Sequence, residues 1–289
     1  MQSVLIGLTI DRFRGIAPST LLKLARLVGV NFVEITHSVF DDLPAVLAEL
    51  GPIKCGFHLP NYGDHGIDFS HESFKNEINQ LIENVNNYHQ HLHVQYCLAH
   101  PPEGHPTLSK AKNANSYLFD NLRKLRPPVI IENIQSMSFE EFQAFFEMAK
   151  DELGDKLIGQ CYDPAHYFVG GEDPLAVLDR MKFPIATVHL SDCRADKDSH
   201  LPFNMGGVLP VNAIINKLYH MKYRNSINLE LLPRSLDELD SIVASYLTVV
   251  RRFHPVRYLI TRARMSMLLP LLQRKLRTYG KQQGALNAD

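Results

Sequence analysis

Short apolar runs alternate with amphipathic stretches along almost the whole chain. The runs are rich in β-branched and aromatic residues and are bounded by polar or turn-forming residues, which is typical of buried strands. The amphipathic stretches repeat apolar positions every three or four residues, which is typical of helices. Strands are predicted at residues 4–9, 32–36, 53–58, 93–100, 129–133, 157–163, 186–192 and 227–231.

A helix-like segment follows each predicted strand. Helices are predicted at residues 19–29, 41–51, 72–90, 113–126, 138–154, 173–182, 210–222 and 235–253. Ser19 is a candidate cap for the first of these. Ser138 with Glu141, and Ser235 with Glu238, have the spacing of capping boxes, in which a serine and a glutamate bond to each other's backbone amides.

Eight strands that are each followed by a helix predict an α/β fold, a (β/α)8 TIM barrel over residues 1–253. A doubly wound open sheet is the alternative, but no GxGxxG phosphate turn follows the first strand. Residues 254–289 form a basic helical extension beyond the eighth unit. Residues 250–289, which include this extension, carry nine Lys or Arg and one Asp, whereas residues 1–249 carry 21 basic and 30 acidic side chains.

The composition is that of an ordinary globular protein, with 45% hydrophobic and 21% charged residues among 289. The N-terminus lacks the features of a secretory signal peptide, and no apolar run reaches the roughly 20 residues that span a bilayer. Four cysteines stand singly, which favours reduced thiols in a cytoplasmic protein over a disulfide framework. Cys161 lies in an apolar run and is interpreted, like Cys55 and Cys97, as a core residue.

Acidic residues and histidines lie at or just after the ends of most predicted strands. In a barrel these ends meet on one rim, where active sites are found. The residues are His58, His100, Glu132, Asp163, His166, His189, Asp198, His200 and Glu230, with Asp198 and His200 in the loop after the seventh strand.

A metal centre accounts for this set better than separate structural roles do. Taken singly, Asp163 fits a helix cap before Pro164, His166 fits an ordinary helical position, and a buried histidine such as His58 can be satisfied by a hydrogen bond. Glu132 and Glu230 lie in apolar strands, where an unpaired carboxylate costs several kcal/mol. The strand ends hold no Lys or Arg to balance them. Carboxylates with imidazoles suit Zn, Mn, Fe or Co rather than Mg alone.

Several short motifs carry a resemblance to a known superfamily. They are HLP at 58–60, AHPPEG at 99–104, IIENI at 130–134, CYDPAHYFVGG at 161–171, VHLSD at 188–192, DSH at 198–200 and LELLP at 229–233. In these stretches the chain resembles the xylose isomerase-like TIM barrel superfamily, which includes endonuclease IV and many sugar epimerases. The resemblance covers residues 1 to about 250.

The resemblance implies specific roles. In the superfamily's sugar isomerases and epimerases, residues matching Glu132, Asp163, His189 and Glu230 hold one metal ion. His166 then matches a substrate-binding histidine. In endonuclease IV the five remaining positions are also ligands, and three zinc ions bind. A related branch of multinuclear iron oxygenases has a D-x-H-x-P loop, which DSHLP at 198–202 matches.

The chain also departs from these relatives. Its first strand lacks the histidine typical of endonuclease IV, and the loop at 201–210 has Gly-Gly where G-E-G is common. The βα loops are not rich in arginine, although Arg12 or Arg194 can lie on the rim. Phosphate contacts supply most nonspecific nucleic-acid affinity, so nucleic acid remains an alternative partner that is not favoured.

The favoured hypothesis is a metal-dependent isomerase or epimerase, or a dehydratase, of a sugar, sugar phosphate or related hydroxy-carbonyl compound. Glu132 and Glu230 act as acid and base, and His166 orients a hydroxyl. The other substrate-binding candidates are His58, His100 and Arg194.

Two other classes stay open. The first uses one to three ions, either as an endonuclease IV-like phosphodiester hydrolase with a trinuclear zinc site or as a multinuclear iron oxygenase. The second is an accessory protein that docks through its basic tail. The tail can alternatively pack across the barrel or a homodimer interface.

Overall fold

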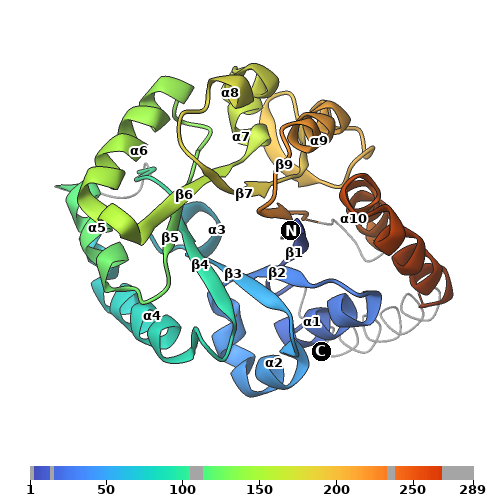
Figure 1. Cartoon of the computed structure of the whole chain (residues 1–289). Coiled ribbons are helices and arrows are strands. Elements are labelled where there is room, and N and C mark those ends of the chain that lie inside the picture. Colours follow the sequence, from blue (N-terminus) through green and yellow to red (C-terminus); the bar gives the residue numbers. More distant parts are fainter. Residues whose placement is uncertain (1–2, 14–15, 105–112, 233–237, 269–289) are drawn as a thin grey trace, which may run out of the picture.

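Eight parallel strands close into a barrel in the order β1-β10-β7-β6-β5-β4-β3-β2 (Figure 1). The computed structural model describes residues 3–13, 16–104, 113–232 and 238–268. The closed barrel confirms the predicted TIM barrel, and the alternative of an open sheet is wrong. The strands are β1 (Leu5–Ile10), β2 (Phe32–Ile35), β3 (Lys54–His58), β4 (Val94–Ala99), β5 (Val129–Glu132), β6 (Leu157–Tyr162), β7 (Ile185–His189) and β10 (Ser226–Leu229).

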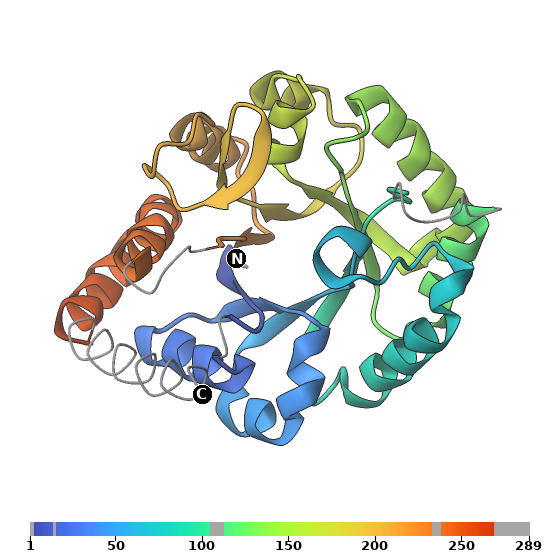
Figure 2. The ribbon, with the colours of Figure 1, turned by 180° about the vertical axis from the view of Figure 1, so that it is seen from behind.

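Helices form a ring around the barrel, as both faces of the molecule show (Figures 1 and 2). Among the described residues, none of them is long and apolar enough to cross a membrane. The helices are α1 (Pro18–Val28), α2 (Leu43–Leu50), α3 (Tyr62–His65), α4 (Lys75–Tyr88), α5 (Ala114–Lys124), α6 (Phe139–Leu153), α7 (Pro164–Val169), α8 (Pro174–Arg180), α9 (Val211–His220) and α10 (Leu239–Phe253).

Alternation along the strands separates two apolar cores. In β2, Val33 and Ile35 pack in the large core between the strands and the helices, whereas Phe32 belongs to a small separate core. Successive strand residues point to opposite faces, so the small core fills the barrel interior. Its buried members are Phe32, Tyr96, Leu98, Ile130 and Cys161.

Two of the predicted helix caps lie in the described residues, and one of them is confirmed. Ser138 and Glu141 form the predicted capping box of α6. The prediction for Ser19 is wrong, because α1 begins one residue earlier, at Pro18, and the Ser19 hydroxyl donates to the Asp42 carboxylate instead. The predicted box at Ser235 lies outside the described residues.

The segment after β7 is an antiparallel hairpin rather than the predicted loop. It consists of β8 (Asp192–Arg194) and β9 (Lys197–Leu201). The Asp192 carboxylate accepts hydrogen bonds from the amides of Cys193 at 2.9 Å and Leu209 at 3.0 Å. A Cβ on Gly207 would lie 2.1 Å from that carboxylate, so the second glycine of the Gly-Gly pair allows the close approach. The hairpin is therefore fixed to the barrel.

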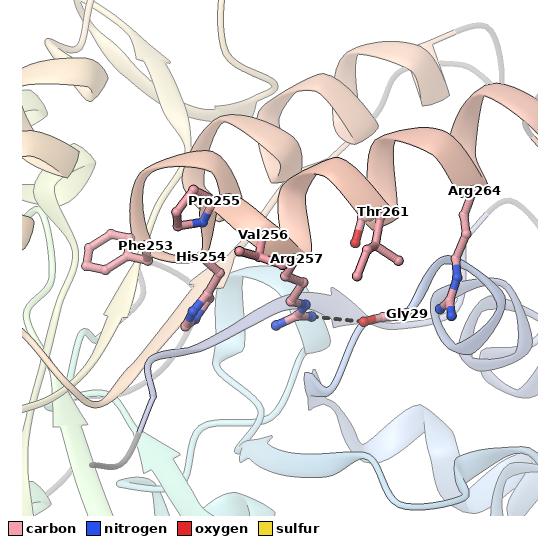
Figure 3. A pocket seen from close by; sticks show the side chains of 9 residues that line it. Gly29, Phe253, His254, Pro255, Val256, Arg257, Thr261 and Arg264 are labelled. Carbon is pink, nitrogen blue, oxygen red and sulfur yellow. Dashed lines mark hydrogen bonds between the residues drawn. The ribbon is translucent and has the colours of Figure 1, made fainter.

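A further helix over 255–268 follows α10 and packs against the barrel at the N-terminal end of β1. The His254 ring donates from Nε2 to the Val4 carbonyl at 2.7 Å. Arg257 donates to the Gly29 carbonyl at 2.9 Å, beside a cavity of about 610 Å³ (Figure 3). These contacts confirm the extra helical segment and favour packing for its described part. His254 separates α10 from this helix, and we propose that the barrel ends at residue 253 and the extension begins at residue 254.

Replacing the α6 cap should destabilise the protein measurably. Ser138→Ala removes the acceptor for the Glu141 amide, and we expect a loss of about 1 kcal/mol in the free energy of unfolding, measured by urea denaturation. Ser116→Ala is the matched control, because Ser116 is exposed in α5 and the described residues give its hydroxyl no partner. An equal loss in both variants would contradict the capping role.

Candidate metal centre

The structure places the predicted rim residues at one end of the barrel. His58, Glu132 and His189 end β3, β5 and β7, while His100, Asp163 and Glu230 immediately follow β4, β6 and β10. Because all eight strands are parallel, their C-terminal ends share one rim. Glu132, Asp163 and His189 have no exposed surface.

Four of these residues form a compact group. Glu132, Asp163, His189 and Glu230 each offer one ligand atom, and these atoms all lie within 4.8 Å of one another. His189 Nδ1 lies 2.9 Å from Glu132 Oε1 and 2.8 Å from Glu230 Oε2. The group therefore presents three carboxylates and one imidazole to a single position.

Asp163 serves as a helix cap and also faces the centre. Its Oδ1 accepts hydrogen bonds from the amides of Ala165 at 2.7 Å and His166 at 3.1 Å, which caps α7. Its Oδ2 is buried without a hydrogen-bond partner among the described residues. The Asn133 side chain fixes the Asp163 backbone with two bonds of 2.8 Å. The two interpretations of Asp163 are thus compatible.

A second compact group contains His58, His100 and Glu132. Glu132 Oε2 lies 3.2 Å from Nε2 of His100 and 3.6 Å from Nε2 of His58. The other ring nitrogen of His58 donates to the Leu59 carbonyl at 2.8 Å, which leaves its Nε2 facing the centre. Glu132 is therefore shared by both groups.

The hairpin brings the remaining two predicted ligands to His166. Asp198 Oδ2 lies 3.1 Å from Nε2 of His166 and 3.3 Å from Nε2 of His200. The His166 ring is held from the other side, because its Nδ1 donates to the Asn133 carbonyl at 2.7 Å. All nine predicted residues are thus linked through short contacts in one region.

Arg194 lies apart from these groups. It is exposed and lines a cavity of about 900 Å³ together with Lys197, His100, His166 and other residues. In the described part of the chain, neither Arg194 nor Lys197 pairs with an acid. The structure therefore leaves both cations free to contact a molecule in this cavity.

The imidazoles balance the buried carboxylates electrostatically. Burial raises the pKa of Glu132, but His189, His100 and His58 outweigh it and hold this pKa well below the usual range. Burial lowers the pKa of His100, but Glu103 and Glu132 outweigh it and raise the value to about 10. Burial raises the pKa of Asp163 to about 6. Without a cation, protons on the imidazoles supply the compensating charge.

The residues fit a divalent cation. Among the described residues, Glu132 Oε1, Asp163 Oδ2 and His189 Nδ1 are buried without hydrogen-bond partners, although each lies in the four-residue group. Unsatisfied buried polar atoms are costly unless an ion or water pairs with them. A donor set of carboxylate oxygens and imidazole nitrogens suits Zn, Mn, Fe or Co.

Sequence reasoning missed Glu34 and the location of Cys161. Glu34 in β2 has no exposed surface, and its Oε1 lies 2.8 Å from Nε2 of His189. Cys161 is buried as predicted, but its sulfur also forms a compact group with Glu132 and His189. An acid inside the apolar run FVEIT was the signal for Glu34, the same signal that singled out Glu132.

Comparisons with known proteins agree with the fold. A family model described as xylose isomerase-like TIM barrel matches residues 22–246. An AP endonuclease, family 2 from Brucella melitensis has a similar structure, with a TM-score of 0.61 and 15% identity, over 81% of this chain and 95% of that one. No curated protein matches the sequence significantly.

Two epimerases are similar to about the same degree. D-allulose 3-epimerase from Methylomonas sp. has a TM-score of 0.60 and 13% identity, over 93% of this chain and 98% of its own. The structure of an L-ribulose 3-epimerase has a TM-score of 0.59 with the same identity and coverage. At these identities the structural likeness shows the fold alone.

Cation binding should strengthen as pH rises. A cation must displace the protons that His100 holds up to a pKa of about 10 and Asp163 up to about 6, so apparent affinity should increase across that window. Calorimetric titration with Co²⁺ at about pH 6 and about pH 8, in buffers of different ionisation enthalpy, measures both affinity and proton release. His100→Gln should release fewer protons. Binding that is independent of pH and releases no protons would refute this account.

Proposed function

The chain belongs to the xylose isomerase-like TIM barrel family, and on that premise we propose that it is a divalent-metal-dependent isomerase or epimerase of a small hydroxy-carbonyl compound, such as a sugar or sugar phosphate. The four-residue group of Glu132, Asp163, His189 and Glu230 carries this proposal. These residues would hold the metal ion. When bound, the ion supplies Lewis-acid stabilisation of negative charge on the substrate oxygens.

The two glutamates supply the proton-transfer groups. Glu132 is the last residue of β5, and Glu230 directly follows β10. The two carboxylates lie within 2.9 Å of His189 Nδ1 and come from different parts of the barrel wall. One carboxylate removes a proton from carbon and the other returns one. Glu230 is the more accessible of the two, with a side chain that is 23% exposed against 0% for Glu132. We therefore assign the base role to Glu230.

The cavity beside the group suits a small substrate. Its volume of about 900 Å³ lies in the range of small-molecule sites, and His100 and His166 line it. The His166 ring is held by the Asn133 carbonyl at Nδ1, and its Nε2, which also contacts Asp198 at 3.1 Å, would orient a substrate hydroxyl. Arg194 and Lys197 would bind a phosphate or carboxylate on the substrate.

A specific observation supports a second candidate, a phosphoester hydrolase with several metal ions. Glu132 belongs to two compact groups, and Asp198 lies between His166 and His200, so the region offers more donors than one ion needs. Multinuclear clusters stabilise both the attacking and the leaving oxygen of a phosphoester. The same surplus of donors suits a multinuclear iron oxygenase. A nucleic-acid substrate is less well supported, because Arg12 pairs with Asp41 at 3.0 Å.

Metal stoichiometry distinguishes the two candidates. Elemental analysis of purified protein reconstituted with Mn²⁺, Co²⁺, Zn²⁺ or Fe²⁺ should give one tightly bound equivalent per chain that is sufficient for isomerisation. Three equivalents, together with phosphate release from small phosphoesters or cleavage of an abasic duplex, would replace the isomerase proposal with the hydrolase. A failure to bind any of these ions would refute both.

Removing the Glu230 base should abolish proton exchange at carbon. In D2O the metal-loaded protein should introduce deuterium into a substrate from a panel of ketoses and ketose phosphates, detected by NMR. Glu230→Gln keeps an oxygen donor but no base, and we expect a rate at least about 100-fold lower at saturating metal. Glu152→Gln, on the exposed face of α6, is the control. Equal exchange by wild type and Glu230→Gln would exclude the assigned role.

A further inference from the structure

Glu34 is a buried carboxylate outside the nine predicted rim residues. It lies in β2 with no exposed surface, in register with Thr9 of β1 and Gly56 of β3. An isolated ionised carboxylate in such a place is strongly unfavourable unless it has polar partners. Its contacts therefore indicate what it does.

The partners of Glu34 come from strands on other sides of the barrel. Its Oε2 accepts a hydrogen bond from the Tyr96 hydroxyl at 2.9 Å. Its Oε1 lies 3.5 Å from Nδ2 of Asn228 and 2.8 Å from Nε2 of His189. The His189 ring nitrogen is not aligned for a hydrogen bond, so this last contact is electrostatic. Glu34 thus connects β2 to a residue of the four-residue group.

The two nitrogens of His189 face different carboxylates. Nδ1 lies within 2.9 Å of Glu132 and Glu230, whereas Nε2 faces Glu34. A neutral imidazole carries its proton on one nitrogen and a lone pair on the other. A carboxylate oxygen at 2.8 Å attracts a proton on Nε2 and repels a lone pair there. With a cation between Glu132, Glu230 and His189, Nδ1 would supply its lone pair to the ion and the ring proton would lie on Nε2, where Glu34 stabilises it.

The surroundings of Glu34 are built for hydrogen bonding. The Tyr96 hydroxyl also lies 3.2 Å from Thr187 Oγ1, which accepts from Ser226 Oγ at 2.8 Å. A Cβ on Gly56 would lie 2.6 Å from the Tyr96 ring and hydroxyl, so the glycine leaves the space that Tyr96 fills. This network satisfies Glu34 without a cation. It distinguishes Glu34 from Asp163, whose Oδ2 has no partner among the described residues.

We propose that Glu34 is a positioning residue, which keeps the proton on Nε2 of His189 so that Nδ1 is presented to the metal ion. The inference rests on the metal dependence in the proposed function and not on the reaction. One competing arrangement is specific: Glu34, His58 and His189 are themselves close enough to hold a cation. Glu34 would then be a ligand, and its loss would remove an ion.

The test compares Co²⁺ binding by wild type and Glu34→Gln. Glutamine has nearly the same shape but no charge, so the electrostatic contact with His189 is lost. We expect about 10–100-fold weaker Co²⁺ binding, measured by competition with a chromophoric chelator, because outer residues of metal sites have effects of this size. The visible absorption of bound Co²⁺ should shift, and the number of ions per chain should not change.

Two further variants control for general damage to the barrel. Gln160→Leu removes a buried polar group that contacts Gln143 of α6 rather than the centre, and it should lower stability without changing Co²⁺ affinity. Tyr96→Phe keeps the Glu34 carboxylate but removes its hydroxyl donor, so it should weaken binding by less than Glu34→Gln does. If Glu34→Gln does not fold, unchanged affinity in Tyr96→Phe decides against the proposal.

Each remaining result has a definite meaning. Unchanged affinity and absorption in Glu34→Gln would overturn the positioning role. The loss of one equivalent of Co²⁺ would overturn it in favour of a ligand role. Failure of the wild type to bind Co²⁺ would instead refute the metal-dependent function, and this inference with it.

Discussion

The structure depends on how buried negative charge is balanced inside an apolar barrel. Glu34, Glu132 and Asp163 have no exposed surface, and the groups that face them in the described part of the chain are imidazoles, hydroxyls and amides rather than guanidinium or ammonium groups. Imidazoles balance carboxylates only while they hold protons. A divalent cation supplies the same charge and releases those protons, so it competes with them more successfully as pH rises. The centre is therefore stable in either of two charge states, with protons or with metal.

Because of the pleat of the strands, the carboxylates and imidazoles of the rim lie above a layer of apolar side chains in the barrel interior. Inward positions on one strand run from Tyr96 through Leu98 to His100, and on the next from Ile130 to Glu132. A side-chain period of two carries each strand from the closed apolar interior to the rim. The lower layer excludes water from the underside of the centre, which strengthens the electrostatic contacts above it.

The barrel and the nine rim residues could be predicted from sequence because both follow from short-range patterns. Each strand is an apolar run, and six of the nine residues are polar residues at or directly after the end of one. Glu34 was missed because it lies inside its strand, and only the closed barrel brings β2 opposite His189. The hairpin was missed because the Asp192 carboxylate at its start is held by the Leu209 amide and approached closely by Gly207, which lies 15 residues later. Ser19 failed as a cap because α1 begins at Pro18, which places Ser19 inside the helix.

The β8–β9 hairpin is a separate element, outside the barrel sheet, that contributes several polar side chains to the candidate site. A ten-residue segment, 192–201, carries Asp198 and His200 toward the centre and Arg194 and Lys197 toward the cavity, while the barrel strands and the residues that follow them supply the other seven predicted residues. The segment is attached through Asp192, the carbonyls of Cys193 and His200, and the contact of Asp198 with His166. Under the proposed function, substitutions in this one segment would change the number of metal-ligating groups and the charge that faces the substrate together.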